Sequence, residues 1–406
     1  MNTRIRFLSF CYLLSVFFIV PLLHLYNFPG TNINFMNIGL VIILILCVYS
    51  RFFYPKITVD TVYLPLLIYI PLQTIYACLM YDIDTIALIL SAGQYVAFFV
   101  LLFFFNTELF DLSFARKSLF IIATISCIYI IVQAIAATFL GIYIGAGIPF
   151  LEVSNDVIAN YTDVVTKYDI GYRPRSFFSE PAMFCTYVLL AFIISLYELL
   201  ILKQKSSLKY LQISLYILGI LVSRSSLGIL TLVFTCFCFI SYYNIHSGIK
   251  LTFTKILFAG FLIVGGILLL QTSIVQEQIT RLFYNDLLNE PRLKFLNDLN
   301  STYYTNAEIF FGHDFKLLTY SGEFLPSFFR QFYCFGLIGE ILLIIFLFKI
   351  FIRLTLLQRF ILISFVFQMI GSELLHGGNF LLYFSWLLPI KKYEDYYRNK
   401  EENTKT

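Results

Sequence analysis

Charged residues are scarce in this sequence. Only 13% of its 406 residues are Asp, Glu, Lys or Arg, whereas 59% are hydrophobic, and the mean hydropathy is +0.83. Soluble domains carry about 25% charged residues, so this chain cannot cover its surface with polar groups in water. A helix of about 20 apolar residues can instead cross a bilayer with its backbone polar groups satisfied. The composition therefore excludes a soluble enzyme and predicts an all-α, polytopic integral membrane protein.

The usual patterns of metal, nucleotide and nucleic-acid sites are also missing. The sequence has no HExxH motif, no clustered His or Cys, no glycine-rich phosphate loop and no basic patch for nucleic acid. Its eight cysteines fall within or beside apolar runs, where they are expected to pack as small hydrophobic residues without disulfides. The sequence therefore predicts no metal, no cofactor and no nucleic-acid partner.

Apolar runs occur along almost the whole chain, which we interpret as one transmembrane domain (1–406). The first run lacks a small-residue cleavage site and is expected to be a retained span. We predict twelve spans, at 7–26, 36–54, 62–80, 85–105, 118–140, 182–202, 208–222, 226–244, 254–271, 328–351, 358–371 and 379–390.

The distribution of basic residues predicts the orientation. With the N-terminus in the cytoplasm, 19 of the 28 Lys and Arg residues, Arg116 and Lys117 among them, fall in cytoplasmic segments and nine fall outside. Both termini are then inside, and 391–406 is a charged cytoplasmic tail. The two long loops, 141–180 and 271–326, lie outside, so we expect any chemistry on the outer face.

The first long loop ends in a basic segment. Pro174 disfavours a helix at Arg173, and in an extended segment Arg173 and Arg175 point the same way as a cationic clamp. Pro181 suits the first position of a helix, which makes Glu180 its N-cap. Two guanidinium groups beside a helix N-terminus suit a phosphate or diphosphate. Alternatively, these arginines bind lipid headgroups or pair with aspartates of the same loop.

A third arginine lies in a similar position. Arg224 stands between two predicted spans, and Ser225 or Ser226 can cap the second of them. A charge so close to hydrocarbon usually faces the bundle interior or a wet cavity. The alternative is an interfacial arginine whose side chain extends toward the membrane surface.

The second long loop contributes further candidates. Residues 274–288 have the spacing of an amphipathic helix on the membrane surface, and Arg292 follows it. His313 and His376 are expected to be the only two of four histidines on the outer side, where either could act as a general base or be an ordinary interfacial residue. Glu323 and Arg330 flank the start of the tenth predicted span. In that span Gly336 and Gly339 indicate close helix packing.

Five of these elements, taken in order, carry a family resemblance. The segment RPRSFFSEP at 173–181 resembles the R-x-S-F-F-x-E-P signature of O-antigen and capsule repeat-unit polymerases (Wzy-like), and SRSS at 223–226 is similar to an element that these enzymes share with O-antigen ligases. Arg292, FGH at 311–313 and FGLIG at 335–339 follow in the order of the family's later elements. The resemblance spans about residues 120–345.

The resemblance implies a metal-independent glycosyltransferase in the bacterial cytoplasmic membrane. It would move a growing glycan from undecaprenyl diphosphate to the non-reducing end of a new lipid-linked repeat. Its partners would be undecaprenyl-diphosphate-linked oligosaccharides, membrane lipid and a chain-length regulator protein. The expected catalytic residues are Arg173, Arg175, Glu180, Arg224, His313 and Glu323. Contacts to the lipid diphosphate or glycan are expected from Tyr172, Ser176, Ser225, Arg292, Arg330 and His376.

Two other functions stay open. Ligases carry a histidine just before the span that matches 328–351, and residues 321–330 contain none. This departure favours a polymerase and makes Glu323 a candidate base beside His313. A flippase or transporter of the lipid-linked repeat would predict ionisable residues at mid-membrane and a repeated half-structure, whereas here the charges concentrate at the outer rim.

Overall fold

Apolar helices make up most of the computed structural model. It describes residues 3–28, 33–53, 61–80, 85–145, 151–153, 172–246, 306–313, 326–375 and 378–389. Among these residues, six helices are long and apolar enough to cross a membrane: Arg4–Leu22, Phe35–Phe52, Thr61–Met80, Leu112–Leu140, Pro181–Leu200 and Ser327–Arg353. Shorter apolar helices accompany them, so the chain is built as a polytopic helical membrane protein. Eleven of the twelve predicted spans overlap a helix, and the ninth (254–271) lies outside the described residues.

The elements follow one another along the chain. The helices are α1 (Thr3–Leu14), α2 (Val20–Leu22), α3 (Phe35–Phe53), α4 (Leu64–Met80), α5 (Thr85–Phe103), α6 (Leu112–Leu140), α8 (Pro181–Leu200), α9 (Ser207–Val222), α10 (Ser226–His246), α14 (Asn306–Phe311), α16 (Ser327–Arg353), α17 (Leu356–Met369) and α18 (Gly378–Leu387). A π-helical turn, Ser15–Ile19, joins α1 to α2. The described strands are β1 (Tyr26–Asn27) and β2 (Glu152–Val153), a short antiparallel pair that the all-α prediction did not include.

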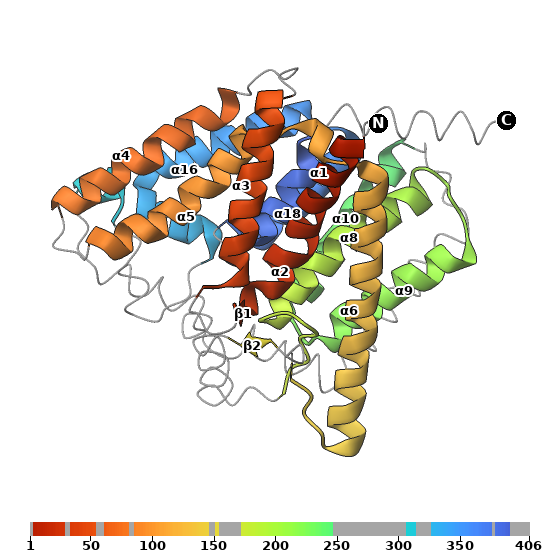
Figure 1. The fold of residues 1–406 in the computed structure, drawn as a ribbon. Helices are drawn as coiled ribbons and strands as arrows, with labels where there is room; N and C mark the ends of the chain where they lie inside the picture. The colour runs from red at the N-terminus through yellow and green to blue at the C-terminus, as the bar shows by residue number, and fades with distance from the viewer. Residues whose placement is uncertain are drawn as a thin grey trace.

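Helix α8 lies at the centre of the packing. In α8, 78% of the most apolar window is buried, whereas the other five long helices bury between 33% and 50%. It packs against α6, α9, α10, α17 and α18. Helices α4, α5 and α16 form a second group on the other side of α1, α3 and α18, as Figure 1 shows. The residues that begin and end α8 are therefore fixed by helices on several sides.

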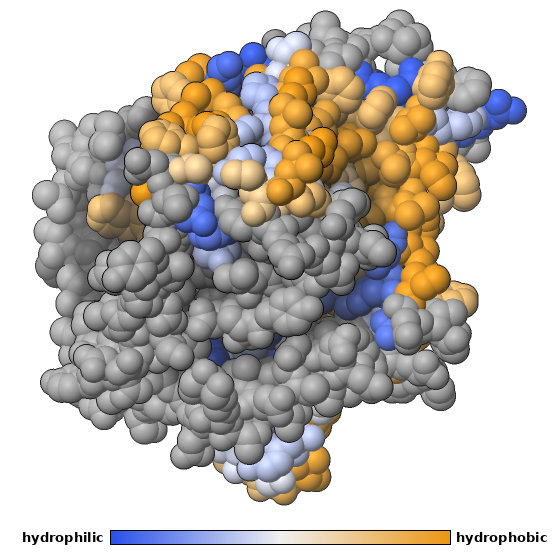
Figure 2. Space-filling view, turned by 90° about the vertical axis from the view of Figure 1, so that its left-hand side faces the viewer, coloured by the Kyte–Doolittle hydropathy of each residue, from blue (hydrophilic) through white to orange (hydrophobic). Residues whose placement is uncertain are grey.

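The long helices of the described bundle carry apolar side chains on their outer faces. Along α6, Ile125, Ile128, Val132 and Ile135 are each about half exposed, and their spacing puts them on one helix face. Figure 2 shows apolar side chains gathered likewise over the described part of the face on the α4 side. An exposed apolar stripe of this length favours a lipid environment, because exposing so much apolar surface to water is unfavourable.

Helix α6 begins earlier than predicted. The Asp111 side chain accepts a hydrogen bond from the Phe114 backbone at 3.1 Å and caps the helix, which then runs to Leu140. Arg116 and Lys117 therefore lie in its first two turns and not in the preceding connection. The prediction missed this because hydropathy fades at a charged helix end while backbone hydrogen bonding continues.

Helix α16 is broken where one continuous span was predicted. Gly336 has φ +64° and ψ −168°, outside the helical region. The break frees backbone carbonyls, which need other partners in an apolar setting. The Tyr69 hydroxyl of α4 donates to the Phe335 carbonyl at 2.7 Å, and the His313 backbone N–H donates to the Tyr333 carbonyl at 2.7 Å.

The short helix α14 fits against this break. Gly312 also has a positive φ, +81°, and a Cβ on Gly312 or Gly336 would overlap the backbone of the other segment. The close packing predicted from the glycines of this span is confirmed. Gly336, however, packs against the short helix α14 and not against a long helix.

Candidate functional site

The basic segment 172–180 is held against α6 before it enters α8. Ser176 has φ +56°, its backbone N–H donates to Gln133 Oε1 at 2.8 Å, and its hydroxyl donates to the Ser126 carbonyl at 2.9 Å. Ser176 and Gln133 are fully buried. The Tyr172 hydroxyl donates to the Ile144 carbonyl at 2.7 Å. In this conformation Ser176 positions the segment, and its hydroxyl is held by the Ser126 carbonyl.

Two of the predicted arginines meet across 51 residues of sequence. The Arg173 guanidinium Nη2 donates to the Arg224 carbonyl at 2.7 Å. Arg224 has φ +53° and occupies the turn between α9 and α10. Ser225 is nearly buried, and its hydroxyl accepts from the Gly228 backbone at 3.2 Å, which confirms the predicted cap of α10. We call segments 172–180 and 223–225 together the arginine edge.

The start of α8 completes the arginine edge. Glu180 has extended backbone angles and is the N-cap, and Pro181 is the first helical residue, both as predicted. The Glu180 side chain makes no capping hydrogen bond. Arg175 Nη1 donates to the Ser179 carbonyl at 2.5 Å. Three arginines and one carboxylate thus lie at the N-termini of two helices, and both the side chains and the helix ends favour an anion there.

A histidine that the sequence reasoning did not select reaches the arginine edge. His24 lies two residues beyond the first span, and its Nε2 is 2.7 Å from Ser179 Oγ. Its Nδ1 is 3.0 Å from the Pro21 carbonyl, which can only accept, so the proton is on Nδ1 and Nε2 accepts from Ser179. Burial lowers the pKa of His24 below 6.5, because the imidazolium is poorly solvated there.

The expectation that His313 and His376 are the only histidines on this side was therefore wrong. The signal for His24 was present, because the predicted topology already put the end of the first apolar run outside. We missed it because a histidine inside a predicted span looked like part of the helix.

Arg330 pairs with a carboxylate that was also not selected. Its guanidinium forms an ion pair with Glu373, and both side chains are about one-fifth exposed. Ser327, at the start of α16, donates from its backbone and its hydroxyl to the Ser372 carbonyl, at 3.0 and 2.8 Å. The neighbouring Gly371 packs closely on Leu227 of α10. This pair therefore lies at the same end of the bundle as Arg224. The sequence did offer a signal for Glu373, because it is a lone carboxylate in a short connection between two apolar helices.

His313 is placed elsewhere. Its carbonyl accepts from Gln73 Nε2 of α4 at 2.6 Å, its ring stacks on Tyr333, and its Nε2 is 3.8 Å from Glu308 Oε1. Figure 1 shows α14, which precedes it, beside α4, on the far side of the molecule from α8, α9 and α10. The structure does not bring His313 together with Arg173 and Arg224.

The remaining predicted site residues, Arg292, Glu323 and His376, lie outside the described residues, as do the tail 391–406 and most of both long loops. Among the residues that the structure does describe, no group of three or more His, Cys, Asp or Glu side chains could hold a metal ion.

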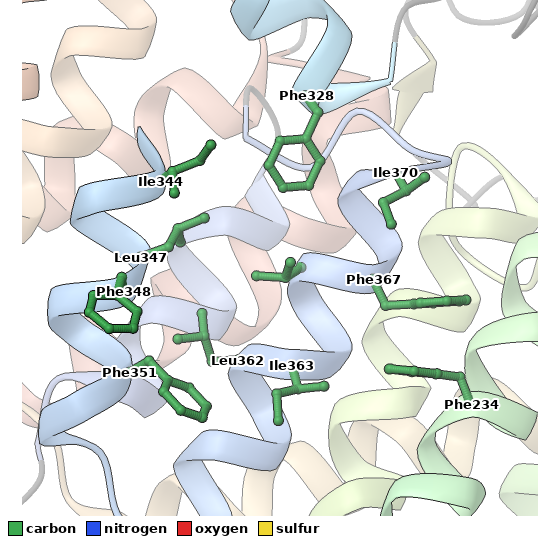
Figure 3. Close-up of a pocket in the computed structure, with 11 residues that line it drawn as sticks. Phe234, Phe328, Ile344, Leu347, Phe348, Phe351, Leu362, Ile363, Phe367 and Ile370 are labelled. Atoms are coloured by element: carbon green, nitrogen blue, oxygen red, sulfur yellow. The ribbon is translucent and has the colours of Figure 1, made fainter. Parts of the chain in front are cut away.

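An apolar groove runs between α10, α16 and α17. It has a volume of about 440 Å³, and Figure 3 shows only hydrocarbon side chains around it. Phe328 and Ile370 lie at one end, next to the residues that join α16 to the Gly371–Glu373 segment. Phe351 and Phe234 lie farther along. The groove therefore begins near the arginine edge and continues beside the bundle.

Comparison with known proteins gives no further constraint: no protein-family model, curated protein or solved structure matches this chain.

Proposed function

We propose that this protein polymerises oligosaccharide repeat units carried on undecaprenyl diphosphate, at the outer face of a bacterial cytoplasmic membrane. The proposal places about twelve spans in the membrane, both termini in the cytoplasm and the arginine edge outside. In this reading the growing glycan leaves its carrier and joins the non-reducing end of a new lipid-linked repeat.

One observation carries the proposal above the others. The contact of 2.7 Å between Arg173 and the Arg224 carbonyl joins two basic segments at the N-termini of α8 and α10. A diphosphate in the membrane interface needs such a cluster of cationic groups and helix N-termini. The arginines would stabilise the negative charge that grows on the diphosphate as it departs.

The chemical step needs a base for the acceptor hydroxyl. A new bond forms from that oxygen to the anomeric carbon of the donor sugar, while the bond from this carbon to the diphosphate oxygen breaks. The hydroxyl proton goes to the base, and undecaprenyl diphosphate leaves. His24 suits this role among the described residues, because it is neutral and lies at the arginine edge, where its Nε2 accepts from Ser179 Oγ. The acceptor hydroxyl would pass its proton to Ser179 Oγ while the Ser179 proton moves to Nε2.

The apolar groove supports the same assignment. A polyprenyl chain is a long hydrocarbon, and the groove offers an apolar path that starts near Arg330 and Glu373. The carrier could thus keep its tail against α16 and α17 while its diphosphate contacts the arginines.

The test is a length ladder made by purified protein from lipid-linked repeats. We expect wild-type protein to make chains of many lengths, and Arg173→Ala or Arg224→Ala to slow chain growth about 100-fold or more. Lys349→Ala is the control, because this exposed residue lies at the other end of α16.

Cells carrying the arginine variants distinguish the alternatives. A polymerase defect leaves single repeat units on the surface glycolipid. Loss of all surface glycan, including single units, would instead indicate the ligase or the flippase and would overturn this proposal.

A further inference from the structure

A basic pocket lies at the opposite end of the bundle from the arginine edge. It has a volume of about 480 Å³ and lies between the first turns of α6, the segment that joins α8 to α9, and the start of α9. Arg116, Lys205 and Lys209 line it, together with Phe120, Leu208 and Gln212. Arg116 and Gln133 are 17 residues apart on α6, so the pocket lies about 25 Å along the helix from the arginine edge.

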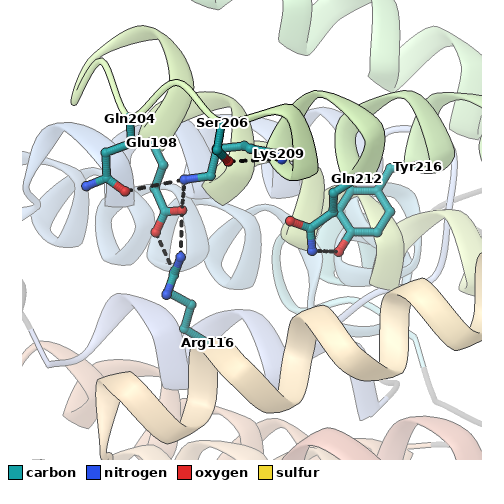
Figure 4. A network of polar contacts seen from close by, with 7 residues as sticks. All are labelled: Arg116, Glu198, Gln204, Ser206, Lys209, Gln212 and Tyr216. Carbon is teal, nitrogen blue, oxygen red and sulfur yellow. Dashed lines mark hydrogen bonds and ion pairs between the residues drawn. The ribbon is translucent and has the colours of Figure 1, made fainter.

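A buried carboxylate fixes two of the three cations. Glu198 of α8 is fully buried, and its Oε1 and Oε2 each lie 2.5 Å from a cation, Arg116 Nε and Lys209 Nζ. Lys209 Nζ also donates to Gln204 Oε1 at 3.3 Å. Figure 4 shows Glu198 between the two basic side chains. These cations are already ordered, so an anion that binds them does not have to order them first.

The pocket keeps a net positive charge. The single negative charge of Glu198 neutralises one of the two positive charges of Arg116 and Lys209. The exposed Lys205 adds another positive charge. Helix α6 itself has no carboxylate, and Asp111, which caps it, does not line the pocket. Two positive charges therefore face whatever enters.

Apolar side chains flank the same opening. Leu208 lines the pocket and is 76% exposed, and Leu211, one turn later on α9, is 66% exposed. Phe120 of α6 forms part of the wall, and the Arg116 guanidinium lies 5.0 Å from the centre of its ring. A polar floor with an apolar exit matches a molecule that is anionic at one end and hydrocarbon at the other.

We propose that this pocket binds the phosphate of an anionic phospholipid, whose acyl chains then pass over Leu208 and Leu211. Basic pockets between transmembrane helices select such headgroups by charge. The site is independent of the polymerase proposal and requires only that the helices lie in a bilayer.

The test measures thermal unfolding of the full-length protein in detergent while phosphatidylglycerol, phosphatidylcholine or inorganic phosphate is added. We expect phosphatidylglycerol to raise the melting temperature of the wild type more than phosphatidylcholine does. Lys205→Ala should weaken the apparent affinity for phosphatidylglycerol about fivefold, the effect of one basic residue at a membrane surface. Lys205→Glu should abolish the preference between the two lipids.

Lys205 suits this test because its side chain is exposed and removing it leaves the Arg116–Glu198–Lys209 contacts in place. Without added lipid, all variants should melt with the wild type. Lys349→Ala removes an exposed positive charge elsewhere and should keep the full preference for phosphatidylglycerol. The proposal fails if Lys205→Glu keeps that preference. It also fails if inorganic phosphate stabilises the protein as well as phosphatidylglycerol does, because the pocket would then recognise an anion without its lipid chains.

Discussion

Burial determines the protonation state of His24. The ring lies between the Pro21 carbonyl and the Ser179 hydroxyl, and the imidazolium would lose its hydration there. The folded protein therefore holds the pKa of His24 below 6.5. A neutral ring with an accepting Nε2 is the state that a general base needs near neutral pH. The same contacts hold the first span against the segment that carries Arg175. The His24 side chain therefore positions this segment and also offers a proton acceptor beside it.

The lowered pKa of His24 predicts a pH-dependent stability. Below about pH 6.5 the unfolded chain binds a proton at this residue more readily than the folded chain does, so the free energy of unfolding falls as the pH falls. This loss of stability grows as the pH falls, until the pH reaches the pKa of His24 in the folded protein. Above pH 6.5 both states are neutral and the contribution disappears. Melting temperatures measured between about pH 5 and 8 should therefore fall less steeply on the acid side in His24→Gln than in the wild type.

The comparison of slopes separates titration from the lost contact. His24→Gln can lower the melting temperature at every pH, because the bond to Ser179 changes, and that offset does not affect the slope. Equal acid slopes for the wild type and His24→Gln would show that His24 does not titrate as its burial requires.

At the scale of elements, the break in α16 is the feature that depends most on particular residues. Gly336 and Gly312 both have positive φ, and the backbones of α14 and α16 touch between them. The Gln73 side chain and the Tyr69 hydroxyl of α4 complete this junction through hydrogen bonds to His313 and Phe335. Helix α4, which is far away in sequence, thus meets α14 and α16 at the point where a helix is interrupted.

Gly336→Ala should disrupt this junction. Its φ of +64° with ψ −168° is a conformation almost confined to glycine and costs an alanine about 1–3 kcal/mol. The added methyl would also overlap the backbones of Phe310 and Gly312, which adds about 1–3 kcal/mol. We expect a melting temperature several degrees lower, measured in detergent. Gly93→Ala in α5 is the matched control, because no atom lies within 4 Å of its added methyl and the melting temperature should hardly change. Equal melting temperatures for both variants would mean that the two glycines are not in contact.

Local signals explain which elements could be predicted from the sequence. An apolar run of 20 residues becomes a helix because lipid leaves the backbone no other partner, and Pro181 and Ser225 mark helix starts through their own chemistry. The pairing of His24 with Ser179 joins residues 155 positions apart, and the Arg330–Glu373 and Glu198 contacts are equally non-local. Such contacts depend on how helices pack, which hydropathy does not specify. The kink at Gly336 was missed for the same reason.

At the scale of the whole molecule, the two ends of the bundle differ in chemistry. One end has the arginine edge, with His24 and the start of the apolar groove. The other has the Glu198 network and the basic pocket. Helices α6, α8 and α9 each run from one end to the other, so the same three helices position both sites. The two proposals therefore place a substrate at one end of the bundle and a structural lipid at the other.

This arrangement predicts opposite accessibility for two engineered cysteines. Tyr143 is 68% exposed beyond the end of α6 on the side of the arginine edge, and Lys205 is exposed at the other end. With a membrane-impermeant thiol reagent, Tyr143→Cys should react once the reagent reaches the outer face of the cytoplasmic membrane. Lys205→Cys should react only after that membrane is permeabilised. The eight natural cysteines are buried or half-buried, so wild-type protein measures the background. Labelling of both variants from one side would place both ends on the same face, and the proposed topology and the outward arginine edge would then both be wrong.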